Sequence, residues 1–110
     1  GQVTDMSNMF NRASSFNQNI GGWNVGQVTN MSFMFQGATS FNQDIGGWNV
    51  GKVTNMNNMF NIATSFDQNL CGWQRLERFC FNMFLNSGCS ESNLDICSTS
   101  GTLVAACQTC

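Results

Sequence analysis

The sequence contains no histidine, no proline and no tyrosine, and only 9% of its 110 residues are charged. Histidine is the side chain that most often transfers protons near neutral pH, so its absence removes the usual general base. Four basic residues are too few for a patch that would bind nucleic acid. No apolar run approaches the roughly 20 residues that a membrane-spanning helix needs. These absences predict that the protein is not an enzyme, has no cofactor or metal, and neither binds nucleic acid nor spans a membrane.

Cysteine is absent from the first 70 residues and then occurs six times: Cys71, Cys80, Cys89, Cys97, Cys107 and Cys110. An even number of cysteines in a short chain predicts disulfides and an oxidising, extracellular setting. Six cysteines allow fifteen pairings, and the sequence does not choose among them. A zinc knuckle is the alternative, but it is disfavoured because histidine is missing and Cys107 and Cys110 form the only close pair.

What the sequence does contain is a repeat of 25 residues, which spans 2–26, 27–51 and 52–76. Tryptophan fixes the period at Trp23, Trp48 and Trp73. We therefore predict two parts: three repeats over residues 1–76, and a degenerate fourth repeat with a cysteine-rich C-terminal cap over 77–110. Because the chain opens in the middle of a repeat, we expect it to be a fragment of a longer precursor.

Two periodicities alternate within each repeat. The spacing of Val28, Met31, Met34, Phe35 and Ala38 predicts the inner face of a short helix or 3₁₀ segment. The alternation of large apolar residues with glycine and asparagine around each tryptophan predicts a short strand. The sequence therefore predicts an α/β repeat fold, a leucine-rich-repeat-like right-handed solenoid of short parallel strands and short helices with a disulfide-rich C-terminal cap.

Some of the regularly spaced residues could instead bind metals. The methionines could bind a soft metal and the columns of asparagine could bind calcium, while Asp44 and Asp67 could form a carboxylate pair. Packing in the core accounts for the methionines, because each occurs with phenylalanine at the spacing of an inward face. Hydrogen bonding in turns accounts for the asparagines and aspartates.

The stretch "VTNMSFMFQGATSFNQDIGGWNV" resembles the repeat of BspA-like surface proteins, the 25/26-residue repeat that also occurs in Mycoplasma-type lipoproteins. Residues 1–73 match it closely and 74–97 match it weakly. The resemblance implies a leucine-rich-repeat-like solenoid at the cell surface or outside the cell, used for adhesion or structure. It transfers no binding residue, because the repeated residues are themselves structural.

An N-terminal end without a cap would leave apolar side chains uncovered, so we predict an assembly end formed by Val3, Met6, Met9, Phe10 and Phe16. A head-to-tail contact between such ends would build a filament. The expected function is therefore a non-catalytic extracellular filament or cell-surface scaffold subunit.

The alternative is an adhesin-like binding module that recognises a surface protein or a glycan. The two functions differ in that a filament subunit self-associates without a ligand. Asn30 begins an Asn-Met-Ser sequon and is a possible N-glycosylation site.

Overall fold

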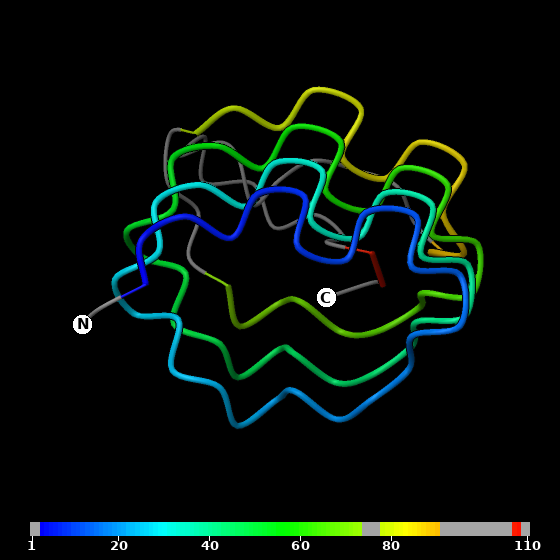
Figure 1. Cartoon of the computed structure of the whole chain (residues 1–110), viewed down its shortest axis with the longest axis horizontal. Coiled ribbons are helices and arrows are strands. Elements are labelled where there is room, and N and C mark those ends of the chain that lie inside the picture. The colour runs from blue at the N-terminus through cyan, green and yellow to red at the C-terminus, as the bar shows by residue number, and fades with distance from the viewer. Residues whose placement is uncertain (1–2, 74–77, 91–106, 109–110) are drawn as a thin grey trace.

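The computed structural model describes residues 3–73, 78–90 and 107–108. The chain winds into a stack in which each coil lies beside the next, from blue through cyan and green to yellow in Figure 1. We name the layers coil 1 (residues 3–26), coil 2 (27–51), coil 3 (52–73) and coil 4 (78–90). The whole chain measures 36 × 34 × 22 Å.

The predicted solenoid of short strands and short helices is wrong. The described residues contain no helix and no strand; they form turns, extended segments and isolated bridges, three of which are parallel bridges between successive coils. The bridges join Asp5 to Asn30, Asn30 to Asn55, and Asn55 to Phe79. Successive coils therefore form a β-bridge at one point only, and no continuous β-ladder follows.

The segment predicted to be helical is instead a series of tight turns. The Met34 amide donates to the Met31 carbonyl three residues back, whereas the Met31 amide donates across the layer to Asn55, 2.9 Å away. This alternation requires left-handed residues in each coil, and coil 2 has them at Phe33 (φ 59°) and Gly37 (φ 68°). A left-handed residue interrupts a right-handed helix and turns alternate peptide groups toward the next coil.

On the opposite side of each coil, side chains make the hydrogen bonds that a strand would make through its backbone. The Asn42 amide donates to Oδ1 of Asn17, and Nε2 of Gln43 donates to the same oxygen. Nε1 of Trp48 donates to the Ile20 carbonyl at 3.1 Å. Because each of these bonds uses at least one side-chain atom and none joins backbone to backbone, the segment around each tryptophan is extended without being a strand.

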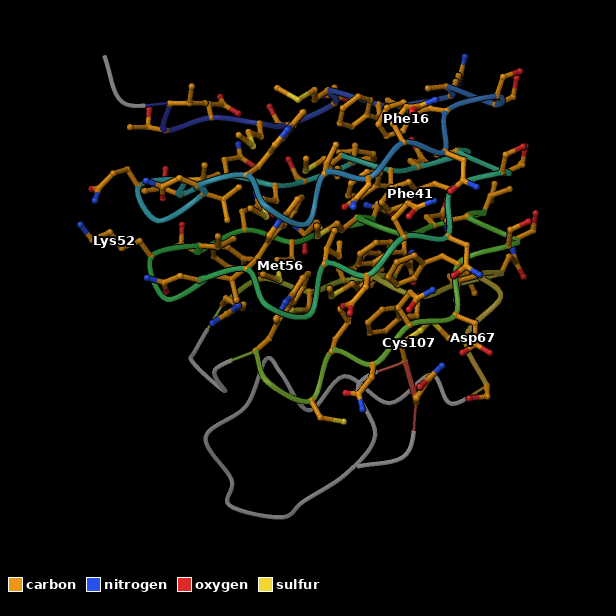
Figure 2. All side chains as sticks on the ribbon, turned by 90° about the horizontal axis from the view of Figure 1, so that it is seen from below. Phe16, Phe41, Lys52, Met56, Asp67 and Cys107 are labelled. Carbon is orange, nitrogen blue, oxygen red and sulfur yellow. A yellow bond between two sulfur atoms is a disulfide. The ribbon has the colours of Figure 1, made fainter. Side chains whose placement is uncertain are left out.

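The inward-facing residues that the apolar spacing picked out do form the core. Val28, Met31, Met34, Phe35 and Ala38 are all fully buried. Phenylalanines continue this core from layer to layer in two columns, with ring centroids 5.5 to 5.8 Å apart. Figure 2 shows Phe16 and Phe41 of one column in successive layers.

Asparagine is abundant because it closes the turns. Oδ1 of Asn19, Asn24 and Asn30 each accepts the amide two residues ahead, at 2.9 to 3.0 Å. Coils 2 and 3 repeat these turns, with Asp44 in the place of Asn19. Such side chain to backbone bonds are the usual reason for asparagine and aspartate in turns.

Candidate assembly surfaces at the two ends of the stack

Coil 1 exposes the side chains that coil 2 buries. Met9 is 45% exposed and Trp23 is 41% exposed, whereas their equivalents Met34 and Trp48 are 0% and 4% exposed. The residue types are identical, so the difference comes from position in the stack. The outer face of coil 1 is therefore an apolar surface of a kind that marks an interaction site.

The five residues of the predicted assembly end differ in exposure. Val3 and Met9 are exposed, Phe10 and Phe16 are half-buried, and Met6 is buried. Phe10 and Phe16 stack on each other at 3.9 Å between ring centroids, and each also packs against the phenylalanine below it in coil 2. The aromatic pair thus has one face covered by coil 2.

Coil 1 also presents a row of unused hydrogen-bond acceptors. In coil 2 the carbonyls of Ser32, Met34 and Gln36 accept amides from coil 1 at 2.6 to 3.0 Å. The equivalent carbonyls of coil 1 belong to Ser7, Met9 and Asn11, and they have no donor among the described residues. A buried carbonyl is normally paired, so this row is suited to a partner that supplies amides.

Trp23 adds a donor to the same end of the stack. Its equivalents Trp48 and Trp73 each donate Nε1 to an isoleucine carbonyl of the preceding coil, at 3.1 Å. Trp23 has no such acceptor within the part of the chain that the structure describes. The indole therefore offers both an apolar face and an N–H group.

The opposite end presents the complementary groups. In coil 3 the amides of Asn58, Phe60 and Ile62 donate to carbonyls of coil 4 at 2.9 to 3.0 Å. The equivalent amides of coil 4 belong to Asn82, Phe84 and Asn86, which find no acceptor among the described residues. A cavity of about 380 Å³ lies over this segment, and it is lined by residues 82–87 and Cys89.

Coil 4 carries apolar residues where the earlier coils are polar. Phe79 stands at the position of Asn30 and Asn55, and Phe81 at the position of Ser32 and Asn57. The two phenylalanines are 68% and 71% exposed. Sequence analysis missed this patch, although the replacement of asparagine by phenylalanine within a repeat was a signal that could have found it.

Cys107 and Gln108 attach to the side of the stack at the level of coil 4. Nε2 of Gln108 donates to the Asp67 carbonyl at 2.9 Å and to Oδ1 of Asp67 at 3.3 Å. Gln68 makes the same pair of bonds to Asn42 one layer earlier. A disulfide joins Cys107 to Cys89, and Figure 2 shows Cys107 beside Asp67.

The prediction of disulfides is confirmed for the described cysteines. Cys89 is bonded to Cys107. Cys71 and Cys80 are also each disulfide-bonded. Cys97 and Cys110 lie outside the described residues. The disulfides fasten the last layers, where the repeat loses its tryptophan.

Asn30, the possible glycosylation site, is half-buried in the middle of the stack. Its Oδ1 accepts the Ser32 amide at 2.9 Å, and Ser32 itself is buried. Asn55 occupies the same position in coil 3 and makes the same turn. The residue thus has a structural role, and glycosylation stays a prediction.

Charge is sparse on both ends. Hydrogen bonds from Ser7, first from its side chain and then from its backbone, lower the pKa of the exposed Asp5 carboxyl. Burial lowers the pKa of Arg78, which lies against Sδ of Met56. Among the described residues, neither end carries enough charge to attract a partner over long distances, so recognition by these residues must depend on apolar contact and hydrogen bonds.

The coils, the aromatic columns and the hydrogen bonds between layers define a stacked-repeat protein. A family model described as "Mycoplasma protein of unknown function, DUF285" matches residues 1–96, and the chain belongs to this family. No curated protein and no solved structure matches the chain. Within residues 3–73, 78–90 and 107–108, no helix is long and apolar enough to cross a membrane.

Proposed function

We propose that the chain is a non-catalytic extracellular structural protein, a filament or cell-surface scaffold subunit that assembles through the ends of its stack. The observation that carries this proposal is the outer face of coil 1. There Met9 and Trp23 are exposed although the same residues are buried one layer further on. Covering such apolar surface is favourable by roughly 25 cal/mol for each Å² removed from water.

Two further observations support a location outside the cell. Disulfides persist in oxidising compartments and are rare in the cytosol. The repeat also resembles that of BspA-like surface proteins, a finer placement than the family match itself gives. The disulfides and the resemblance of the repeat are both compatible with a location at the cell surface, where a rigid stack of coils can serve as a scaffold.

Light scattering after size-exclusion chromatography, under non-reducing conditions, tests the proposal. We expect the wild-type chain to form species heavier than its 12.1 kDa monomer, in amounts that rise with concentration. Met9→Glu places a charge on the outer face of coil 1 and should return the chain to a monomer. Ser65→Glu is the matched control, because Ser65 is exposed on the side of coil 3, away from both ends. A wild-type chain that stays monomeric at every concentration would contradict the proposal.

One observation favours the alternative, an adhesin-like binding module for a surface protein or a glycan. Phe79 and Phe81 form an exposed apolar patch on coil 4 that the core does not use. In that case the chain stays monomeric and binds a ligand found by screening glycans and surface proteins. Phe81→Ser should then abolish binding without lowering the melting temperature, because Ser32 already occupies the equivalent position in coil 2.

A further inference from the structure

The backbone hydrogen bonds between layers that start from residues 6–12, and from the equivalent residues of coils 2 and 3, all point one way. The Arg12 amide donates to Gln36, the Gly37 amide to Asn61, and the Ile62 amide to Leu85. In each case the earlier coil donates and the later coil accepts. Over residues 7–11 the outer face of coil 1 therefore presents carbonyl acceptors, and over residues 82–86 coil 4 presents amide donors.

This polarity restricts how two copies can meet through the turn segments. Two coil 1 faces would bring carbonyl against carbonyl, and two coil 4 faces would bring amide against amide. Neither arrangement forms a hydrogen bond, and each would leave polar groups buried without partners, at about 1–3 kcal/mol for each group. Only coil 4 of one copy against coil 1 of the next supplies donors to acceptors.

We infer that, if the chain assembles as proposed above, the turn segment 7–11 of one copy lies in the cavity over residues 82–87 of a second copy. The repeat sets the register. The Asn58 amide pairs with Phe81, which stands at the position of Ser7 in coil 1. By the same rule, the amides of Asn82, Phe84 and Asn86 donate to the carbonyls of Ser7, Met9 and Asn11.

The cavity limits the contact to the turn segments. Its volume of about 380 Å³ leaves room beside the backbone of residues 82–87. The side chains of Met83 and Phe84, in contrast, are already covered, with exposures of 0% and 3%. The copy that contributes residues 7–11 therefore adds a partial layer, and its exposed Met9 side chain supplies apolar contact. A contact between different faces does not close on itself, so it continues into a filament.

Asn86→Arg tests the register from the coil 4 side. Asn86 is exposed with φ 59°, and Arg12 occupies the same position in coil 1 with φ 63°, so the backbone accepts arginine there. The longer side chain fills the cavity and should weaken association about tenfold or more. Ile62→Arg is the matched control: Ile62 lies in the same column, is exposed, and has φ 62°, but it belongs to the inner coil 3. It should leave association unchanged.

Mixing two blocked variants tests the polarity by light scattering. Met9→Glu blocks coil 1 and Asn86→Arg blocks coil 4, so each variant alone should be a monomer. Their mixture retains one intact pair of faces and should form a dimer of twice 12.1 kDa and nothing larger. Near-ultraviolet circular dichroism of each variant checks that the tryptophans remain packed.

Other results would overturn the inference in distinguishable ways. If Asn86→Arg alone still forms dimers, coil 1 pairs with coil 1. If Met9→Glu alone forms dimers, coil 4 pairs with coil 4. If both variants assemble like the wild type, a different surface carries assembly, and assembly through the ends fails together with the inferred register. A wild-type chain that never assembles defeats the proposed function together with the inference.

Discussion

Coils 1 and 2 carry nearly the same 25 residues, and they differ in what those residues do. Phe35 of coil 2 packs between phenylalanines of the layers on both sides, Phe10 and Phe60, and is fully buried. Phe10 of coil 1 has a neighbouring layer on one side only among the described residues, and it is half-buried. Trp48 donates to a carbonyl of coil 1, and Trp23 has no described coil to donate to. A repeat residue thus acquires its energetic role from the layers on both sides of it.

The same comparison explains why the ends are the functional candidates. Inside the stack every layer satisfies the donors and acceptors of its neighbours, so the inner coils have little left to bind with. Coil 1 keeps unpaired groups and uncovered apolar side chains with nearly the same sequence as coil 2, whereas coil 4 adds exposed Phe79 and Phe81 through changes in sequence. This is the general property of repeat stacks, whose units are stabilised mainly by contact with the next unit.

Truncating the same phenylalanine in the two coils should give the largest difference. Phe35→Ala removes a ring that is buried on both sides and should lower the free energy of unfolding by about 3–5 kcal/mol. Phe10→Ala should cost about half as much or less, because Phe10 is already partly in water. Urea unfolding followed by tryptophan fluorescence, at a concentration where the chain is monomeric, measures both. Equal losses would mean that another surface covers Phe10 in solution.

Two neighbouring glycines of coil 2 compare a position that contacts the next layer with a position that faces open space. A Cβ on Gly46 would lie 2.5 Å from the Asn69 carbonyl oxygen, whereas a Cβ on Gly47 would meet nothing within 4 Å. Gly46→Ala must therefore push two layers apart and should cost about 1–3 kcal/mol. Gly47→Ala is the control and should be neutral or slightly stabilising. Thermal unfolding of the two variants makes the comparison.

Coil 3 shows what happens when the next layer changes. Cys71 stands at the position of Gly21 and Gly46, where a side chain would collide with the layer below. Its Sγ lies 3.8 Å from the Gln108 carbonyl. A contact with the C-terminal segment thus replaces the close approach of two coils, and the cysteine is tolerated there.

Ile62 allows a smaller test of the turn geometry. A branched residue with φ 62° is strained, and the equivalent positions hold Gly37 in coil 2 and Asn86 in coil 4. Ile62→Asn should raise the free energy of unfolding by about 0.5–1 kcal/mol, because asparagine adopts the left-handed conformation at lower cost. Ile62 is exposed, so little burial is lost. A variant that is less stable than the wild type would show that the Ile62 side chain makes contacts worth more than the strain.

The sequence predicted the inward residues of each coil but not the backbone that carries them. Val28, Met31 and Phe35 are buried as their spacing indicated. The same spacing suits a helix and a series of turns, because both return a side chain to one face after about three residues. The left-handed conformations at Phe33 and Ile62 decide between the two, and neither residue type indicates it.

The ends could be predicted in part. The apolar residues of coil 1 follow from the repeat itself, and the disulfides follow from the cysteine count. The direction of the hydrogen bonds could not be predicted, since amide and carbonyl orientation is a property of the backbone that no side chain reports. The contact of Gln108 with Asp67 could not be predicted either, because the two residues are far apart in the chain. Its likeness to the contact of Gln68 with Asn42 is visible only once the layers are known.

The smallest effect should come from Asp5, which replaces the asparagine that coils 2 and 3 have in the same turn. Its Oδ1 accepts the Ser7 amide at 2.8 Å, and the bonds from Ser7 lower its pKa below the ordinary value. A carboxyl whose pKa is lower in the folded state stabilises the fold above its unfolded pKa, near 3.9, and this stabilisation is lost as the pH falls through the folded pKa. Asp5 is fully exposed, so the contribution is small.

Asp5→Asn should remove this contribution. The melting temperature of the variant should therefore fall less between pH 7 and pH 2 than that of the wild type. Ser7→Ala removes only the side-chain bond, and an NMR titration should show the pKa of Asp5 rise toward its ordinary value. An unchanged pKa in that variant would mean that the backbone amide of Ser7 alone holds the carboxylate, as the Ser32 amide holds Oδ1 of Asn30 one layer further on.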